Sequence, residues 1–315
     1  MKLAFIVGTG RCGSSLIHEI LARHAGVGFV SNIDDNLPRL NLKGRWNGAL
    51  YRTPLGRLTR KGAWARFAPS EAYKLIASQV SPVYANSSRD LEARDVTPWL
   101  AQRFREFFEE RGRQQGADVF LHKYTGWSRI GFFAAIFPEA RFIHIVRDGR
   151  AVANSLLQMP WWPGYRGPEN WAWGNLTQLH LDEWEASNRS YTCLAAIAWK
   201  VLMDSYERAS QELPPERYLQ LRYEDFLAAP RDVLQQIVSF IGLPWTAAFE
   251  RHVRRQKIYA SRSRAFERDL SPDQLAEMQS SLSETLLRYG YATEGARSGR
   301  RKPADEMVEF IKEAS

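Results

Sequence analysis

The feature that most restricts the fold is a glycine-rich turn between an apolar run and an amphipathic stretch near the start of the chain. Residues 3–7 are all apolar, and residues 8–15 read GTGRCGSS. Apolar side chains then recur at helical spacing through residues 13–24. A short apolar run that ends in glycine is typical of a buried parallel strand, and the pattern after it is typical of a covering helix. The chain therefore begins with a strand, a tight turn and a helix, as a P-loop-type α/β fold does.

The same alternation continues along the chain. Strands are predicted at residues 119–122, 142–146 and 218–221, and helices at residues 93–110, 151–157, 192–212 and 231–241. Strands that alternate with helices favour a parallel sheet with helices on both faces. We expect a single α/β domain over residues 1–292 and a tail over residues 293–315. Residues 36–115 match the alternation poorly and are expected to form a helical or irregular insertion that covers the site.

Charge and cysteine content narrow the class of protein. The 315 residues include 43 basic and 35 acidic side chains, which gives a net charge of +8. A basic balance suggests an anionic partner, and nucleic acid, an acidic membrane and a phosphorylated small molecule all fit. Two distant cysteines, Cys12 and Cys193, form neither a disulfide framework nor a metal-ligand cluster and favour a reducing cytoplasm. The apolar runs are too short for a signal peptide or a membrane helix, so we expect a cytoplasmic protein.

The glycine-rich turn has the spacing of a phosphate-binding loop, with Gly8 and Gly13 five residues apart. Glycine lets the backbone approach an anion, and the N–H groups at the start of the following helix point at it. A nucleoside triphosphatase of this pattern has lysine where this chain has Ser14, whereas the cation here is Arg11, inside the loop. An aspartate of the Walker-B type is not evident either, which disfavours magnesium-dependent phosphoryl transfer. A kinase of a small metabolite stays as an alternative.

A second candidate anion site follows the strand predicted at residues 142–146. Arg147 lies at its carboxyl end, the edge at which parallel α/β sheets bind ligands. Ser155 is eight residues further on, about two turns into the next helix, so both side chains can reach one phosphate. Taken alone, an ion pair between Arg147 and Asp148 explains the arginine better. Together with the glycine-rich loop, the site can hold a nucleotide that carries two separated anionic groups.

This set of motifs resembles the sulfotransferases that use 3'-phosphoadenosine 5'-phosphosulfate (PAPS), in particular their bacterial and tyrosylprotein-sulfotransferase-like branch. Residues 5–21 are similar to the segment that binds the 5'-phosphosulfate, and residues 141–157 to the segment that binds the 3'-phosphate. Residues 222–226, which read RYEDF, match a third element, and residues 265–271 resemble a late basic loop over the nucleotide. The likeness runs from the first residue to about residue 291.

The resemblance implies PAPS as donor, adenosine 3',5'-bisphosphate (PAP) as product, and no metal. It places the 3'-phosphate on Arg147 and Ser155 and the adenosine near Tyr223. It also brings Arg268 and one serine of residues 261–264 to the donor; Ser261 is our candidate, although the choice between the serines stays open. The residues implied for the 5'-phosphosulfate are Gly10, Arg11, Cys12, Gly13, Ser14 and Ser15.

Sulfuryl transfer is an in-line displacement in which an acceptor hydroxyl or amine attacks sulfur while the phosphate leaves. The resemblance places Lys123 near the transferring sulfuryl group. By analogy with phosphoryl transfer, positioning and charge stabilisation should dominate, and we assign this role to Arg11 and Lys123. The resemblance implies a general base either shortly after the first helix or near the middle strands. Asp34 and Asp35 lie in the first of these places and are the candidates, although a turn before Pro38 also explains them. His122 ranks below them.

Three further questions stay open in the sequence. His144 lies inside an apolar strand and is expected to point into the core. The tryptophans of residues 159–175 either line an acceptor cleft or pack beneath a loop. A basic nucleic-acid-binding protein is a further alternative. However, the basic residues are dispersed along the chain, and the specific motifs are those of a site for one small anion. The acceptor and the oligomeric state are not evident.

Overall fold

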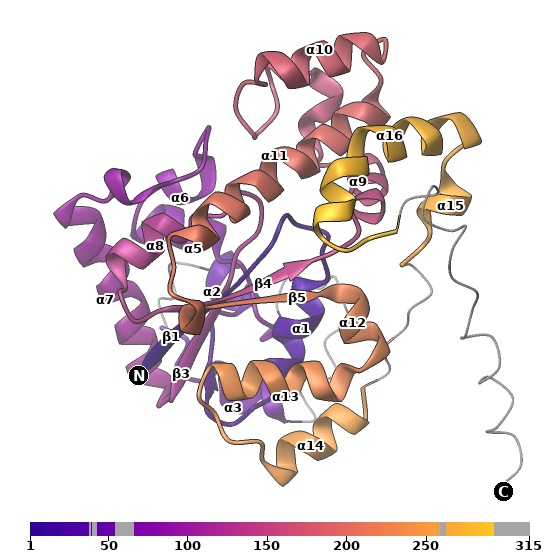
Figure 1. The fold of residues 1–315 in the computed structure, drawn as a ribbon. Coiled ribbons are helices and arrows are strands. Elements are labelled where there is room, and N and C mark those ends of the chain that lie inside the picture. The colour runs from indigo at the N-terminus through magenta and orange to yellow at the C-terminus, as the bar shows by residue number, and fades with distance from the viewer. Residues whose placement is uncertain (38, 40–42, 54–65, 257, 259–262, 293–315) are drawn as a thin grey trace, which may run out of the picture.

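The structure is a computed structural model that describes residues 1–37, 39, 43–53, 66–256, 258 and 263–292 (Figure 1). Its five strands form one parallel sheet in the order β2-β3-β1-β4-β5. Their bounds are β1 Lys2–Val7, β2 Val27–Gly28, β3 Val119–Lys123, β4 Arg141–Val146 and β5 Tyr218–Arg222. The expected α/β class with a parallel sheet is confirmed, and so are the four predicted strands. The sequence did not predict β2, which has only two residues and therefore no readable pattern.

Helices cover both faces of the sheet. Their bounds are α1 Ser14–Leu21, α2 Asn32–Asn36, α3 Asn47–Arg52, α5 Tyr73–Gln79, α6 Val83–Asn86, α7 Pro98–Gln115, α8 Ile130–Ile136, α9 Gly149–Leu157, α10 Gln178–Ala186, α11 Tyr191–Gln211, α12 Tyr223–Ala228, α13 Pro230–Phe240, α14 Ala247–Arg254, α15 Phe266–Asp269 and α16 Pro272–Arg288. Short 3-10 turns lie at η2 Ala93–Asp95, η3 Pro163–Arg166 and η4 Pro215–Arg217. The predicted helices near the start, at residues 151–157, 192–212 and 231–241 correspond to α1, α9, α11 and α13.

The helix predicted at residues 93–110 begins and ends later than expected. Residues 93–95 form the turn η2, and α7 begins at Pro98 after Thr97, whose side chain accepts a hydrogen bond from the Leu100 amide. Proline suits the first turn of a helix because its missing N–H would have no partner there. At the other end, Gly116 takes a left-handed conformation with φ 60°. The proline and the glycine therefore set the true bounds, which apolar periodicity alone misplaced.

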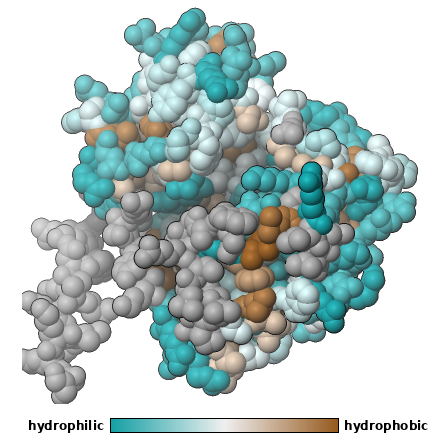
Figure 2. Space-filling view, turned by 180° about the vertical axis from the view of Figure 1, so that it is seen from behind, coloured by the Kyte–Doolittle hydropathy of each residue, from teal (hydrophilic) through white to brown (hydrophobic). Residues whose placement is uncertain are grey.

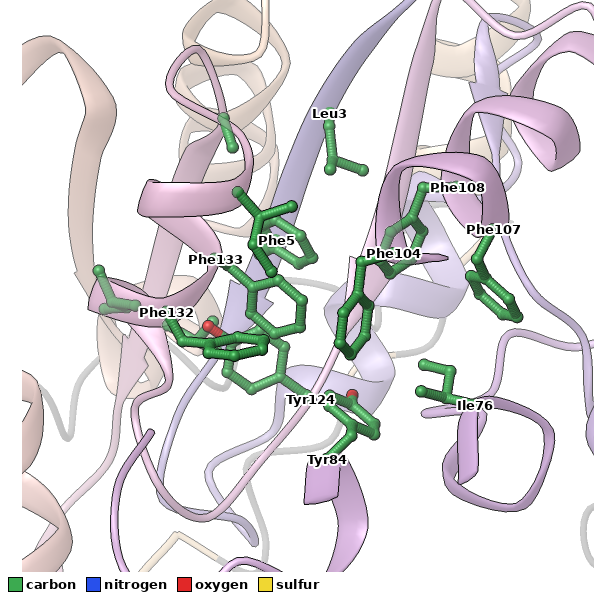
Figure 3. Close-up of a cluster of buried hydrophobic side chains, with 14 of the residues drawn as sticks. Leu3, Phe5, Ile76, Tyr84, Phe104, Phe107, Phe108, Tyr124, Phe132 and Phe133 are labelled. Atoms are coloured by element: carbon green, nitrogen blue, oxygen red, sulfur yellow. The ribbon is translucent and has the colours of Figure 1, made fainter. Parts of the chain in front are cut away.

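Alternate residues of β1 enter two different cores, because successive side chains of a strand point to opposite faces. Phe5 belongs to an aromatic cluster with α7 and α8, in which its ring stacks on Phe133 at 4.6 Å between centroids (Figure 3). Ile6 packs on the opposite face with α1 and α13. Helices α5 and α7, inside the segment expected to be an insertion, contribute Ile76 and Phe104 to the first cluster (Figure 3).

A third apolar cluster lies beside the sheet, where α9, α11 and α16 pack together (Figure 1). Trp162, Trp171 and Trp173 are buried in it, so these tryptophans pack beneath a loop, while Trp161 remains exposed. The surface turned away in Figure 1 is mostly hydrophilic, with a small apolar group near its middle (Figure 2). Within the described residues, the structure contains no helix that is both long and apolar enough to cross a membrane.

Candidate active site

The parallel register brings the carboxyl ends of four strands to one edge of the sheet. Ile6 of β1 pairs with Lys123 of β3, and Val146 of β4 pairs with Arg222 of β5. The glycine-rich loop, Lys123, Arg147 and Tyr223 are therefore neighbours, because each lies at or just after the end of a strand. Ligands of open α/β sheets bind at this edge.

The glycine-rich loop turns through several left-handed residues before α1 begins. Gly10, Arg11 and Gly13 have φ values of 84°, 56° and 89°. Gly13 is the N-cap of α1 and has no side chain with which to cap the helix. The start of α1 is therefore suited to an external anion, which the helix dipole also favours. Cys12 is fully buried in an apolar cluster, so its thiol faces the core.

The two anion sites predicted from the sequence are joined directly. Arg11 Nε donates a hydrogen bond to Ser155 Oγ at 2.8 Å. Arg147 Nη1 donates to the backbone carbonyl oxygen of Arg11 at 2.7 Å. The Arg147 guanidinium also lies 5.4 Å from the centre of the Tyr223 ring, which is cation–π distance. Residues more than 130 positions apart in sequence thus form one cationic surface.

A cavity of about 360 Å³ opens beside this surface, within the range of small-molecule sites. It is lined by Arg11, Arg147, Ala151, Asn154, Ser155, Gln158, Ala265, Arg268 and Asp269. The structure therefore places the predicted Arg268 beside Arg11 and Arg147. The predicted Ser261 lies outside the described residues.

Sequence reasoning missed three polar side chains of this cavity. Asp269 Oδ2 accepts hydrogen bonds from Asn154 Nδ2 and Gln158 Nε2, both at 3.1 Å, which attaches α15 to α9. The hydrogen bonds from Asn154, Arg268 and Gln158 lower the pKa of Asp269, so it remains a carboxylate near neutral pH. One signal was available, since Asn154 and Gln158 are four residues apart and flank Ser155 on one side of a helix.

Lys123 lies between the loop and a carboxylate that the sequence did not single out. Its Nζ donates to Ser15 Oγ at 2.8 Å and to Glu71 Oε1 at 2.5 Å. Thr125 Oγ1 donates to the same oxygen of Glu71 at 3.0 Å. The Lys123 side chain is 9% exposed and that of Glu71 is 22% exposed, so the pair is reachable from outside. Segment 66–72 carries neither strand nor helix periodicity, so no sequence pattern pointed to Glu71.

Asp34 and Asp35, the predicted candidates for the base, are both engaged in local hydrogen bonds. Asp34 Oδ2 accepts from the amide and the hydroxyl of Ser31, both at 2.9 Å, and from Asn47 Nδ2 at 2.5 Å. It completes the capping box of α2. Asp35 Oδ1 accepts from the Leu75 amide at 2.9 Å, and its Oδ2 accepts from Ser70 Oγ at 3.1 Å. The carboxylate that contacts Lys123 is that of Glu71.

The two histidines near the middle strands are buried in the core. His122 Nε2 lies 3.1 Å from the Tyr84 hydroxyl, and burial lowers the pKa of His122 to about 3. His144 stacks on Tyr206 at 4.2 Å between ring centres, and burial lowers its pKa to about 3 as well. The expectation that His144 points into the core is confirmed. Both imidazoles are neutral near neutral pH and fully buried.

Comparison with known proteins assigns this arrangement to a class. A family model described as the Sulfotransferase family matches residues 4–247, a span that includes the glycine-rich loop, Lys123, Arg147 and Tyr223. The chain therefore belongs to the sulfotransferase family. It is a transferase that moves a sulfuryl group, and this membership selects the sulfotransferase interpretation over the kinase and nucleic-acid-binding alternatives.

Individual relatives are distant in sequence. The chain is 24% identical over 329 residues to omega-hydroxy-beta-dihydromenaquinone-9 sulfotransferase Stf3 of Mycobacterium bovis, covering 95% of this chain and 78% of the relative. Sulfotransferase STF9 of Mycobacterium avium superposes with a TM-score of 0.53 at 18% identity, covering 93% of this chain and 78% of that one. The sulfotransferase domain of the curacin biosynthetic pathway gives a TM-score of 0.51 at 15% identity, covering 93% and 98%. These structures share the fold.

Proposed function

We propose that the enzyme takes its sulfuryl group from PAPS and releases PAP. The observation that carries this proposal is the contact between the two anion sites, in which Arg11 bonds to Ser155 and Arg147 bonds to the Arg11 carbonyl. A donor with anionic groups at its 3' and 5' positions needs two anion sites side by side on one surface. Residues 10–15 would hold the 5'-phosphosulfate, while Arg147 and Ser155 would hold the 3'-phosphate.

The adenosine would lie beside Tyr223. Burial raises the pKa of this phenol, and the nearby Arg147 opposes that shift, so the ring is neutral near pH 7 and does not repel the phosphates. Arg268 on α15 adds a third arginine to the cavity. Asp269 is hydrogen-bonded to α9 and keeps this arginine beside the nucleotide. One serine of residues 261–264 would also contact the donor.

In the transfer step, negative charge grows on the oxygen that bridges phosphorus and sulfur. Arg11 and Lys123 would stabilise this charge, and arginine in the loop allows a two-pronged contact with oxyanions. This chemistry assigns no role to a metal. The acceptor is a hydroxyl or an amine, and the name of Stf3, whose substrate carries an omega-hydroxyl, favours a hydroxyl.

The cellular location and the domain boundaries are part of the same proposal. Cys12 and Cys193 are free thiols, which suits a reducing cytoplasm. Residues 1–292 would form the catalytic domain, and residues 293–315, expected from the sequence as a tail, lie outside the described residues. We expect no role for nucleic acid, because the cations that the site gathers surround one small cavity.

Calorimetry of PAP binding tests the donor assignment. Arg147→Ala should weaken PAP binding about 10- to 150-fold, since a hydrogen bond to a charged group contributes about 1.5–3 kcal/mol. Arg94→Ala removes an arginine whose side chain is 70% exposed and is the matched control; its affinity should equal that of the wild type. Tighter binding of ATP with magnesium than of PAP, or an unchanged affinity in Arg147→Ala, would contradict the proposal.

A further inference from the structure

We propose that Glu71 is the general base that takes the proton from the attacking acceptor, an inference that rests on the proposed PAPS-dependent transfer. Lys123 touches Glu71 and Ser15 at once, so it lies between the carboxylate and the start of α1, where the sulfuryl group would bind. A carboxylate on the other side of this lysine would lie beside an acceptor oxygen that approaches the sulfuryl group past Lys123.

The free oxygen of Glu71 points to a proton-accepting role. Lys123 and Thr125 both donate to Oε1, so within the described part of the chain Oε2 has no protein donor. The side chain is 22% exposed, so a small hydroxyl can reach it. A general base must come within hydrogen-bond reach of the proton that it removes, and Oε2 meets this requirement for an acceptor beside Lys123.

The segment that carries Glu71 is anchored on both sides. The Ser70 amide donates to the Val30 carbonyl at 2.8 Å, next to the bridge between Ser31 and Pro69. Asp35 binds the Ser70 hydroxyl and the Leu75 amide, which flank Glu71. Asp35 is therefore a positioning residue for the base.

A second anchor ties the segment to the end of β3. The Tyr73 hydroxyl donates to the Thr125 carbonyl at 3.0 Å and lies 3.3 Å from the Thr125 amide, which donates to it. Both anchors meet at Glu71, which has Ser70 on one side and Tyr73 on the other. A base that is anchored on two sides keeps its distance from the glycine-rich loop of residues 8–15, and effective proton transfer needs such fixed positioning.

The transfer balances with Glu71 as the only proton acceptor. The acceptor oxygen forms a bond to sulfur, and the bond from sulfur to the bridging oxygen breaks. Its electron pair stays on the phosphate, which gives PAP, while the proton of the acceptor moves to Oε2. The protonated carboxyl then loses its proton to water before the next turnover.

Glu71→Gln tests the proposal with little structural change. Both hydrogen bonds to Glu71 end on one oxygen, and the amide oxygen of glutamine can accept both, so the variant can keep these contacts while it loses the basic Oε2 and the negative charge beside Lys123. Glu106→Gln is the matched control, since Glu106 is exposed on α7 and accepts one hydrogen bond from Gln102. Asp34→Asn tests the competing candidate.

Water is the acceptor probe, because the Glu71 side chain is 22% exposed and water can therefore reach it. Single-turnover hydrolysis of PAPS is measured as PAP release across a range of pH, and PAP affinity is measured by calorimetry. Glu71→Gln should slow hydrolysis about 10²- to 10⁴-fold, the usual contribution of a general base, and should lose the acid limb of the pH–rate profile. Its PAP affinity should match that of the wild type, and Glu106→Gln and Asp34→Asn should keep the acid limb.

Two results would overturn this assignment while the proposed donor stands. One is a Glu71→Gln variant with an unchanged rate or an intact acid limb. The other is a wild-type enzyme that binds PAP but hydrolyses PAPS no faster than buffer, since a base beside the donor would activate water. A wild type that does not bind PAP would instead contradict the donor assignment itself.

Discussion

Replacing Gly13 with alanine should destabilise the protein more than its helical position suggests. Gly13 has φ 89°, and a Cβ built there would lie 2.1 Å from Cε2 and 2.2 Å from Cδ2 of the Tyr223 ring. The left-handed conformation costs an alanine about 1–2 kcal/mol. Displacing a packed ring costs about 1–3 kcal/mol more. We therefore expect Gly13→Ala to lower the free energy of unfolding by about 2–5 kcal/mol.

Two comparisons separate these contributions. Gly116 also has positive φ, 60°, but a Cβ there would have nothing within 4 Å, so Gly116→Ala should show the backbone cost alone. Tyr223→Ala removes the ring, so the double variant Gly13→Ala/Tyr223→Ala should be more stable than the sum of the two single effects by about 1–3 kcal/mol.

Urea unfolding followed by fluorescence gives the change in unfolding free energy for the three single variants and the double variant. Calorimetry of PAP binding shows whether the altered loop also binds the ligand more weakly. Because Gly13 and Tyr223 both border the proposed donor site, Gly13→Ala should also weaken PAP binding. Equal destabilisation by Gly13→Ala and Gly116→Ala, together with additive effects of Gly13→Ala and Tyr223→Ala, would refute the contact between the loop and the ring.

Two predictions concern acid stability. Burial lowers the pKa of His122 to about 3, below the roughly 6.5 of an unfolded histidine, so the unfolded chain binds this proton first and stability should fall as pH drops below about 6.5. In urea unfolding measured at a series of pH values, His122→Gln should lose less unfolding free energy on acidification than the wild type. Parallel curves of unfolding free energy against pH for the two proteins would contradict this. Hydrogen bonds from Arg254, Trp245 and Arg231 lower the pKa of Glu250 to about 2, so its stabilisation is present above its ordinary pKa and lost as pH falls toward 2. The melting temperature of Glu250→Gln should fall less over this acid range than that of the wild type. An equal fall would contradict the stabilising role of the hydrogen bonds to Glu250.

The fold class could be predicted because its signals are contiguous. Each central strand is a short apolar run, and the loop after β1 is a glycine spacing that can be read within eight residues. Boundaries were less certain where two local signals competed. The apolar pattern predicted a helix from residue 93, but proline is favoured in the first turn of a helix, and α7 begins at Pro98. The strand β2 was missed because two residues carry no pattern.

The sequence by itself determined the proposed donor side of the candidate site. Arg11 belongs to a local loop motif, and Arg147 and Ser155 belong to one strand–helix unit. Local chain geometry brings each motif to the carboxyl edge of the sheet, because parallel strands all end there.

Only the tertiary structure decided the proposed acceptor side. Glu71 lies in a segment without periodicity, and its place beside Lys123 depends on the anchoring of that segment by Asp35 and Tyr73. The contact of Asp269 with α9 likewise joins residues more than 100 positions apart. A carboxylate acquires a chemical role from its neighbours in space, and long-range packing selects those neighbours. The family resemblance therefore pointed to Asp34 and Asp35, while the fold brought Glu71 to the lysine.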